Sequence, residues 1–503
     1  MIYLLICFIS ILVGSGIGIF LTTYYYPEIP SLMILKNFIP ITLVLASTSA
    51  ILILIRSKKL FIITLSILIT FVSFSYSTIK SKERTDKLLK VKSQNFVKGI
   101  INISFLNKIF VNTGENTILV YVKKFDREFA PIGAEVIISG KSKHIYHYLT
   151  NKNTYGYFLY LFKNNVPYIV YSQEDSIAET KLPNSTFFKA INIIKQDVYK
   201  TFSEKISNTY FLSASLILGE SSEMSKEFTE NIRITGISHI FSVSGFHVGV
   251  IVVAFVLLLN ILRIPKLFQF IIISVFLTGY SLIVGLKPPV VRASILASII
   301  LLVRAINLSP NYLNITLIVG IVMLIINPFL SVDVGFILSF FAVISIILFS
   351  KYIDEFIVSL INRYGKEPNR FLKNIITLFS VSLTAVMFTF PVVIIWFGGA
   401  SLTGILSSII LVPLSSINIV SGIIAYVSNL IIPPIGSIMF RGVNFLNLLF
   451  MIITQLFSKL GLIINLRIDV ITSIVFITLY YIILVVMFIL ISNRRLINEK
   501  NTT

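Results

Sequence analysis

Charged residues, cysteine, histidine and tryptophan are all scarce in this sequence. Charged residues make up 13% of the chain, against roughly 25% in soluble domains. The single cysteine, Cys7, excludes an intrachain disulfide and a thiolate metal cluster. There is no HExxH motif, no clustered ligand set of a dinuclear metallohydrolase and no Gly-rich Walker loop. We therefore expect no metal, no cofactor and no catalytic residue on this chain, and thus no enzyme.

Hydrophobic residues, by contrast, make up 56% of the chain. A helix needs about 20 mostly apolar residues to cross a bilayer, and the run from Asn374 to Phe440 carries no charge at all. Soluble cores are not built from such runs. The sequence therefore predicts a polytopic α-helical membrane protein with about 12 transmembrane segments.

Apolar segments of this kind occur at both ends of the chain. The first lacks a charged region before it and is long enough to span, so we expect it to be retained and not cleaved as a signal peptide. Pro413 and the pair Pro433-Pro434 make the last spans uncertain, because proline can break a helix. The expected spans are Ile2–Thr22, Phe38–Ile55, Leu60–Ile79, Gly245–Leu262, Leu267–Leu286, Pro289–Val303, Tyr312–Asn327, Val334–Phe349, Ile375–Phe397, Leu402–Leu430, Ile435–Phe457 and Val470–Ile491.

Basic loops indicate the orientation of these spans. Arg56, Lys58 and Lys59 place the second loop in the cytoplasm, so the N-terminus is expected inside and the region after Ile79 outside. Alternation from there leaves the later basic loops inside, as the positive-inside rule requires. These loops carry Arg263, Lys266, Arg304, Arg363, Lys366, Arg370, Arg494 and Arg495.

Between Lys80 and Leu182 charges return and apolar residues alternate. The segments Phe96–Ile103, Thr117–Lys123 and Gly133–Gly140 are typical of short strands with Gly and Asn turns. We expect an inserted, extracytoplasmic OB-like β domain, although periodicity alone does not separate this barrel from another small β fold.

A basic amphipathic helix is predicted between Ser185 and Ser207. Phe187, Ile191 and Val198 recur at helical spacing with lysines between them, a pattern usual for a helix on the membrane surface. We expect it to join two domains and not to span.

The positive balance of 42 Lys and Arg against 22 Asp and Glu has two interpretations. Cytoplasmic loops of membrane proteins collect Lys and Arg, and an AT-rich genome adds lysine without a function. A basic path for a polyanion such as DNA would have the same composition.

The stretch Thr235–Gly249 combines small residues with hydrogen-bond donors. The glycines allow close helix packing in a membrane, whereas the serines and histidines supply donors that packing alone does not need. His239 and His247 lie eight residues apart, which on one ideal helix places both on one side. Such a group fits a wet pathway or buried, hydrogen-bonded packing residues. It also fits a metal or catalytic site, but no carboxylate lies close enough in the sequence to complete one.

Two ionisable residues, Arg292 and Asp333, lie within apolar segments. Intramembrane charges are costly and are functional hypotheses by default. Both lie near segment ends, so an interfacial position is the alternative interpretation.

Three stretches resemble the ComEC competence family, in the family's order and spacing. They are Leu216–Ser222 with His239–His247, then Pro288–Ser294, then Asn327–Pro328 with Asp333–Phe340, and together they cover about Ser213–Ser350. Gly133–Gly140 and Tyr155–Leu161 resemble later strands and a helix of that family's OB-like domain, and Phe397–Leu402 through Pro413 resembles a later motif. The chain departs from the family at Ile337, where a Gln is usual, and at Ser408, where an Asn is usual. Many members also carry a C-terminal metallo-β-lactamase-like domain, which we do not expect in this protein because the sequence ends about a dozen residues after its last expected span.

The resemblance implies a channel in the cell (inner) membrane that translocates single-stranded transforming DNA during natural competence. Its implied partners are single-stranded DNA, the lipid bilayer, a DNA receptor outside, a separate helicase or ATPase inside and a separate nuclease. The alternative is a membrane-embedded transporter or enzyme for an anionic lipid or sugar. The residues expected to line the DNA path are His239, Ser242, Ser244, Gly245, His247, Arg292, Asp333 and Ser339. The expected domains are 1–79 (N-terminal helices), 80–182 (β domain), 183–243 (junction helices), 244–491 (channel domain) and 492–503 (cytoplasmic tail).

Overall fold

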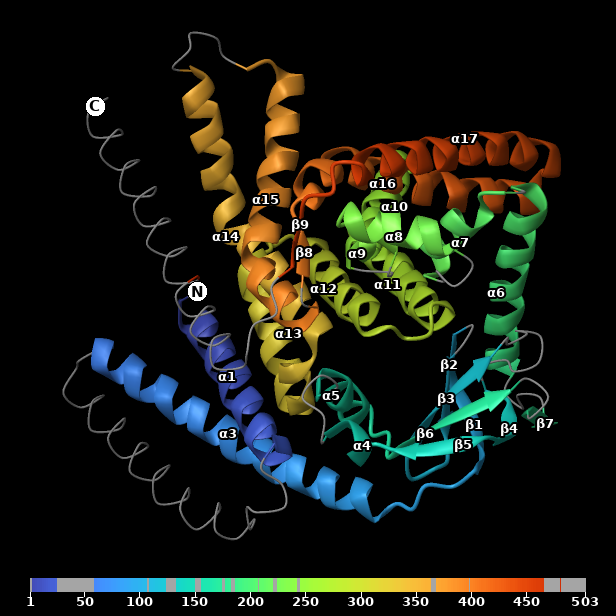
Figure 1. Cartoon of the computed structure of the whole chain (residues 1–503). Coiled ribbons are helices and arrows are strands. Elements are labelled where there is room, and N and C mark those ends of the chain that lie inside the picture. The colour runs from blue at the N-terminus through green and yellow to red at the C-terminus, as the bar shows by residue number, and fades with distance from the viewer. Residues whose placement is uncertain are drawn as a thin grey trace. The chain divides into compact units, whose positions relative to one another are not determined.

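The computed structural model describes residues 2–24, 58–105, 108–123, 133–149, 155–173, 177–181, 186–206, 208–219, 224–241, 245–362, 368–397, 399–465 and 480. The chain forms two compact units (Figure 1). The first unit comprises Met1–Lys195 and Leu313–Ile337, and the second comprises Gln196–Tyr312 and Leu338–Thr503. The expected span Phe38–Ile55 lies outside the described residues, as does Val470–Ile491 apart from Tyr480.

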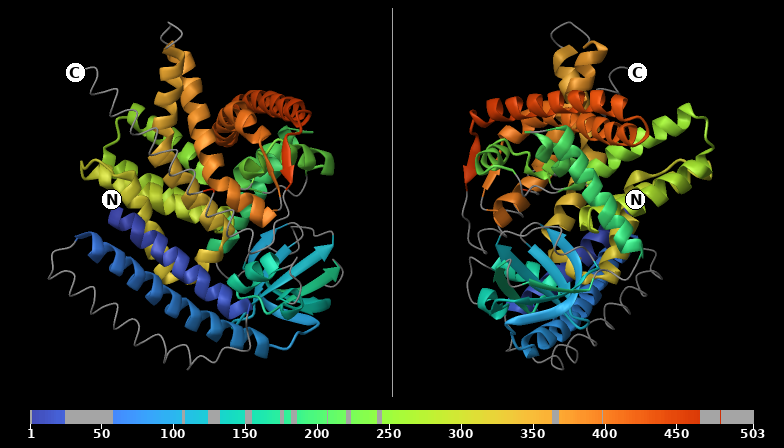
Figure 2. Two further views of the ribbon diagram at one scale, coloured as in Figure 1. Left: turned by 60° about the vertical axis from the view of Figure 1, so that its left-hand side comes forward. Right: turned by 90° about the vertical axis from the view of Figure 1, so that its right-hand side faces the viewer.

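Two long helices of the first unit, α1 (Ile2–Tyr24) and α3 (Lys58–Lys90), lie side by side in every view (Figures 1 and 2). Their backbones come very close at Gly14, where a Cβ atom would lie 2.2 Å from the carbonyl oxygen of Thr70. Ser10 Oγ and Ser66 Oγ are 2.8 Å apart across the same contact. Small residues and hydroxyl pairs of this kind hold helices together where lipid replaces water.

The first unit also contains one seven-stranded sheet. Its order is β5-β6-β3-β2-β1-β4-β7, and all neighbours are antiparallel except the parallel pair β3 and β6. The predicted strands in residues 96–103, 117–123 and 133–140 are confirmed as β1, β3 and β4. The strands are β1 (Phe96–Phe105), β2 (Lys108–Asn112), β3 (Thr117–Lys123), β4 (Glu135–Ser139), β5 (Lys141–His144), β6 (Tyr168–Gln173) and β7 (Ile177–Lys181).

This sheet closes on itself at Gly140. Only that residue separates β4, which pairs with β1, from β5, which pairs with β6, so the two strands form one bent path. A Cβ atom at Gly140 would lie 2.4 Å from the Tyr171 carbonyl oxygen, so the bend requires glycine. Alternate residues of the strands fill the interior of the closed sheet; among them are Val97, Ile101, Val111, Val120, Val136 and Val170.

Two short helices, α4 (Tyr146–Leu149) and α5 (Tyr155–Lys163), connect β5 to β6. The helix expected at Tyr155–Leu161 is therefore present. The first unit ends with most of α13 (Tyr312–Ile326) and the short 3-10 helix η4 (Pro328–Val332), which contacts α1 and α5.

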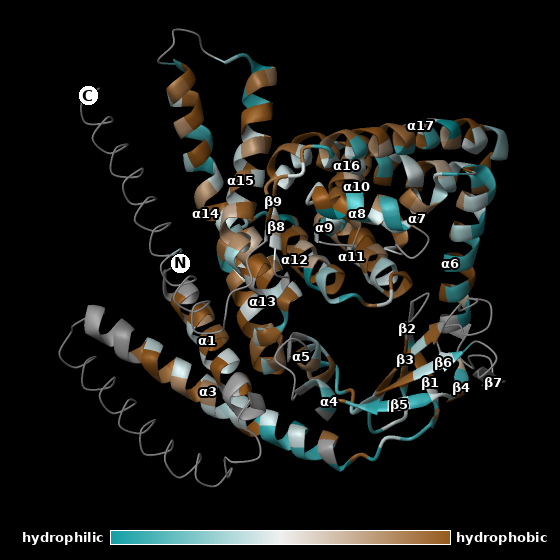
Figure 3. Ribbon diagram, in the orientation of Figure 1, coloured by the Kyte–Doolittle hydropathy of each residue, from teal (hydrophilic) through white to brown (hydrophobic). Residues whose placement is uncertain are grey.

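The second unit is helical, and its helices follow the expected spans to within a few residues, α14 and α15 being longer. Apolar side chains dominate them (Figure 3). Among the described residues of both units, six helices are long and apolar enough to cross a membrane, namely α11, α12, α14, α15, α16 and α17, while Ile6–Ile17 of α1, α10 and α13 are shorter apolar helices. The bounds are α10 (Gly245–Ile261), α11 (Lys266–Ile283), α12 (Pro288–Ala305), α14 (Val334–Asn362), α15 (Arg370–Phe397), α16 (Thr403–Ile431) and α17 (Pro433–Ser458).

The two proline positions have different effects. Pro413 lies inside an uninterrupted α16, and Pro391 likewise lies inside α15. Pro433 instead opens α17, at a position where its missing N–H costs nothing. A short ribbon of β8 (Gly399–Ser401) and β9 (Ile463–Asn465) joins the chain before α16 to the chain after α17.

The predicted amphipathic helix is α6 (Thr186–Lys205), and its apolar stripe is covered only in part: Ile191 and Val198 are buried, whereas Ile194 is 44% exposed. Within the second unit Val198, Phe202 and Ile206 pack against α16 and α17. The rings of Phe202 and Phe440 meet edge to face, with centroids 5.1 Å apart. This part of the stripe is therefore not available for the expected contact with a membrane surface.

Candidate functional site

The polar stretch of the second unit begins at a tight turn between α8 (Lys226–Ile234) and α9 (Ser238–Phe241). Gly236 has φ +74°, and a Cβ atom there would lie 2.9 Å from the Cα of Gly404. Ser407 Oγ donates to the Thr235 carbonyl oxygen at 2.9 Å, and Ser401 Oγ donates to that of Ile234. The turn is therefore anchored to the start of α16 by backbone contact and two hydroxyl groups.

His239 and His247 lie on different helices, so the spacing of one ideal helix does not describe how the two rings are placed. α9 ends at Phe241 and α10 begins at Gly245, with Ser242 and Ser244 outside the described residues. His239 is exposed, with Nδ1 3.2 Å from the Gly236 carbonyl oxygen. His247 is fully buried and its ring hydrogen-bonds to the main chain of Ile240. The structure thus separates a surface imidazole from a buried one.

Arg292 is the largest fully buried side chain of the described residues, at 1% exposure. It lies in the second turn of α12, which packs on α10 so closely that a Cβ atom at Gly245 would lie 3.3 Å from that of Ala293. Gly245 therefore permits the contact that encloses the helix face next to Arg292. A guanidinium stays charged in proteins, so its burial in an apolar bundle is costly and points to a role beyond packing.

The first two family-like stretches meet at Gly219, which ends α7 (Tyr210–Leu218) in the left-handed conformation with φ +70°. Lys287 Nζ donates to the Gly219 carbonyl oxygen at 2.5 Å. Tyr280 donates through its hydroxyl to the carbonyl oxygen of Ile217 at 2.8 Å. The C-terminal carbonyl groups of α7, which have no donor partner within the helix, thus receive hydrogen bonds from Tyr280 on α11 and from Lys287 just before α12.

Asp333 belongs to the first unit, whereas the other described candidate residues belong to the second. Its Oδ1 accepts a hydrogen bond from the Phe336 N–H at 2.5 Å and so caps α14, while its carboxylate forms an ion pair with Lys163 at the end of α5. Arg84 Nη1 donates to the Lys163 carbonyl oxygen at 3.0 Å, and Arg84 Cζ lies 3.7 Å from the ring centroid of Phe329. Burial lowers the pKa of Arg84 to about 10.

These contacts tie α3, α5 and the start of α14 together within the first unit. Asp333 therefore has a defined structural task whether or not it also faces a substrate. Ser339, which was also expected to line the DNA path, lies half-buried on α14.

A buried amide network of the second unit was not expected from the sequence. Asn447 Nδ2 donates to the Thr209 carbonyl oxygen at 3.0 Å and to Ser213 Oγ at 2.9 Å, and its Oδ1 accepts from Asn418 Nδ2 at 2.6 Å. All four residues are buried. The sequence does contain a feature that could have predicted this network, namely one Asn in the middle of each of two apolar helices. Such side chains form hydrogen bonds between helices in a membrane.

A tyrosine cluster of the first unit was also missed. The rings of Tyr121 and Tyr171, partners across β3 and β6, stack with centroids 5.5 Å apart. Their hydroxyls lie 2.8 Å from that of Tyr157 and 3.0 Å from that of Tyr148, respectively. Burial, followed by these hydrogen bonds, raises the pKa of Tyr148 and Tyr157, so both are neutral at physiological pH.

Part of this cluster is open to solvent. Tyr171 is 46% exposed and Tyr160 39%. Lys143 Nζ lies 5.2 Å from the ring centroid of Tyr148, within cation–π range. The surface therefore offers aromatic faces beside a positive charge. Within the described part of the chain, no three His, Cys, Asp or Glu side chains gather as a metal site would require.

A set of apolar helices long enough to span a bilayer, together with a small closed sheet, defines a membrane protein that carries a β domain. The family model described as "Competence protein" matches residues 216–494, which is more than half of the sequence. The chain belongs to this family.

One curated relative is ComE operon protein 3 of Bacillus subtilis (strain 168), which is 25% identical over 201 residues. The aligned part covers 38% of this chain and 26% of the relative, so the match extends over about a quarter of that protein's length. No solved structure matches this chain.

Proposed function

We propose that this protein is a channel of the cell membrane through which single-stranded DNA enters during natural competence. Family membership carries the competence role. The channel role rests on the burial of a permanent cation, Arg292, beside α10. A path for a polyanion through the membrane needs positive charge, whereas a helix that only contacts lipid does not.

The β domain is the proposed external contact for the strand. Its closed sheet, with strand β3 parallel to β6, supports an OB-like barrel, a fold whose faces bind oligonucleotides. The exposed rings of Tyr160 and Tyr171 are suited to stack on bases, and Lys143 to attract phosphate. Such binding is tolerant of sequence and falls as salt rises.

The membrane segment of the path is proposed to run beside α10 and α12. His247 and Arg292 are both buried in the described arrangement, so passage of a strand requires these two helices to move apart. His239, Gly245 and Ser339 are proposed to border the same path, with Ser242 and Ser244. Asp333 is proposed to act by fixing the start of α14.

The orientation and the full set of about 12 spans are part of the proposal. The β domain is placed outside, and the basic loops that include Lys58 and Arg370 inside. The driving force is assigned to a separate ATPase or helicase, capture of DNA to a separate receptor and strand degradation to a separate nuclease. The family match favours this function over a transporter or enzyme for a small anion.

The test is transformation of a strain that lacks this gene and is complemented with variants. We expect Arg292→Ala to lower uptake per inserted molecule by about tenfold or more, because electrostatic attraction changes encounter rates by such factors. His247→Ala is expected to lower it as well, because it removes a hydrogen-bonding group from the proposed path. The matched control is Arg233→Ala, which removes an exposed guanidinium paired with Glu230.

Membrane-inserted protein is measured in the same cells. A packing role would lower the amount of inserted protein and leave uptake per molecule near normal. Normal uptake per molecule in both variants would show that these side chains are structural and would remove the channel proposal's main support.

A further inference from the structure

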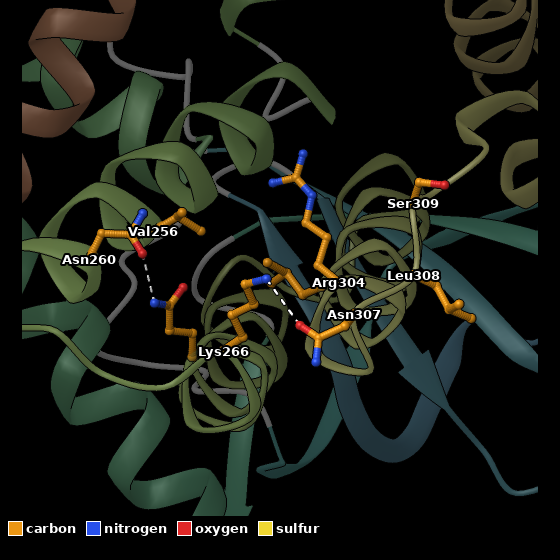
Figure 4. A pocket seen from close by; sticks show the side chains of 9 residues that line it. Val256, Asn260, Lys266, Arg304, Asn307, Leu308 and Ser309 are labelled. Atoms are coloured by element: carbon orange, nitrogen blue, oxygen red, sulfur yellow. Dashed lines mark hydrogen bonds between the residues drawn. The ribbon is translucent and has the colours of Figure 1, made fainter.

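A pocket of about 400 Å³ lies in the second unit, where the turn between α10 and α11 meets the end of α12 (Figure 4). Two of the nearby turn residues, Arg263 and Asn307, have positive φ and reverse the chain sharply after each helix. The pocket is lined by Val256, Asn260, Lys266, Gln269, Leu301, Arg304, Asn307, Leu308 and Ser309.

The lining of this pocket is cationic and rich in amides. Its charged members are Lys266 and Arg304, and none of the residues that line it is acidic. Lys266 Nζ donates to Asn307 Oδ1 at 3.2 Å, and Arg304 Nη2 to the hydroxyl of Tyr312 at 2.8 Å. Both contacts are with neutral oxygens, so the positive charges are oriented but not neutralised by them. Figure 4 shows the two side chains beside the same opening.

The helix ends around the pocket expose large apolar side chains. This rim includes Ile261, Leu262, Leu267, Phe268, Ile306 and Leu308, each more than half exposed. In a chain that spans a membrane, such side chains contact acyl chains and not water. The cationic pocket therefore lies at the level where lipid headgroups meet their hydrocarbon tails.

We propose that this pocket binds the phosphate of an anionic phospholipid headgroup. Lys266 and Arg304 attract the phosphate, the amides of Asn260 and Asn307 and the hydroxyl of Ser309 are available to the rest of the headgroup, and the apolar rim receives the acyl chains. Basic pockets between transmembrane helices bind anionic headgroups in this way. A nucleic acid strand would satisfy the two cations but would leave the apolar rim uncovered.

The test is lipid binding to the purified full-length protein, followed by native mass spectrometry in mixed micelles. Phosphatidylglycerol is titrated against phosphatidylcholine. We expect Lys266→Gln and Arg304→Gln each to weaken phosphatidylglycerol binding about fivefold, and the double variant roughly 25-fold, with phosphatidylcholine binding unchanged. Lys266→Arg keeps the charge and is expected to bind like the wild type.

The matched control is Lys459→Gln, which removes an exposed cation at the end of α17. An equal loss with this control would reduce the effect to general surface charge and overturn the proposal. Displacement of the lipid by inorganic phosphate alone would redefine the pocket as a free-phosphate site. Loss of oligothymidylate binding, with lipid binding unchanged, would assign the pocket to DNA instead.

Discussion

The closed sheet of the first unit and the helices of the second unit differ in the polar groups that they bury and in the apolar groups that they expose. In the sheet the buried positions are Val and Ile, as at Ile101 and Val120. In the helices Arg292, Asn418 and Asn447 are buried, while Val275 and Ile438 are among the exposed residues. The hydrophobic effect is the same in both units, but the solvent is different: water for the sheet and hydrocarbon for the helices.

The difference shows what each unit depends on. The sheet gains stability from apolar area removed from water. The helices gain nothing from that source where lipid replaces water, so packing of small residues and buried hydrogen bonds hold them together. The first two of the following changes are expected to have a large effect in one unit and a small effect in the other, and the last two each test a feature of one unit.

The largest effect is expected for truncation inside the sheet. Ile101→Ala leaves a cavity in a fully buried site and should lower the free energy of unfolding by about 4 kcal/mol. Ile438→Ala, at a residue 68% exposed on α17, should change it by less than about 0.5 kcal/mol. Thermal unfolding of each purified variant measures both values. Similar losses in the two variants would mean that α17 is covered by protein and not by lipid.

A charge placed on the exposed surface should reverse this order. Val275→Asp puts a carboxylate on a residue of α11 that is 68% exposed, and should cost about 3 kcal/mol of membrane insertion. Phe96→Asp, at a residue of β1 that is 59% exposed, should cost less than about 0.5 kcal/mol. The inserted fraction after alkaline extraction is the measurement. Full insertion of the Val275 variant would contradict a lipid-facing α11.

A smaller loss is expected from the amide network. Asn447→Leu leaves Asn418 and the Thr209 carbonyl without their partner and should lower the free energy of unfolding by about 2 kcal/mol. Ser421→Ala, which removes a single hydrogen bond within α16, is the control and should cost less than about 0.5 kcal/mol. If Asn447→Leu stabilises the protein, the network serves specificity or function and not stability.

The smallest effect concerns alkaline pH. Burial, and then the proximity of Tyr121, raises the pKa of Tyr160 to about 12. The folded state therefore keeps a proton that the unfolded state releases from pH 10.0 upward, and the associated stability, present below pH 10.0, is lost as pH rises towards 12. Tyr160→Phe should remove one tyrosine from the late step of a tyrosinate absorbance titration. An unchanged late step would mean that Tyr160 titrates as in water.

The apolar helices were predictable from the sequence, because a bilayer requires long apolar runs. These runs give the bounds of α10 to α13, α16 and α17 to within a few residues, whereas α14 continues to Asn362, beyond the expected Phe349. The strands with regular alternation were predictable for a similar reason. Closure of the sheet at Gly140 and the stacked pair of Tyr121 and Tyr171 were not, because they depend on pairing between strands about 50 residues apart.

The candidate site was predictable in composition but not in geometry. The donors between Thr235 and His247 were recognised, but the break after Phe241 places the two histidines on separate helices. The partners of Asp333 could not be found either, since Lys163 and Arg84 are distant in sequence. The pocket at Lys266 and Arg304 depends on two helix ends meeting, and the sequence shows only that both loops are basic.

The parallel pairing of β3 with β6 has a consequence for the synthesis of the protein. Strands β1 to β4 can pair with one another as soon as they have been synthesised and translocated, but β3 must wait for residues 168–173 before its second edge is covered. During that interval an apolar strand edge is open to other chains. We expect a nascent chain stalled before Tyr168 to be the form of this protein that aggregates most readily and most needs a chaperone.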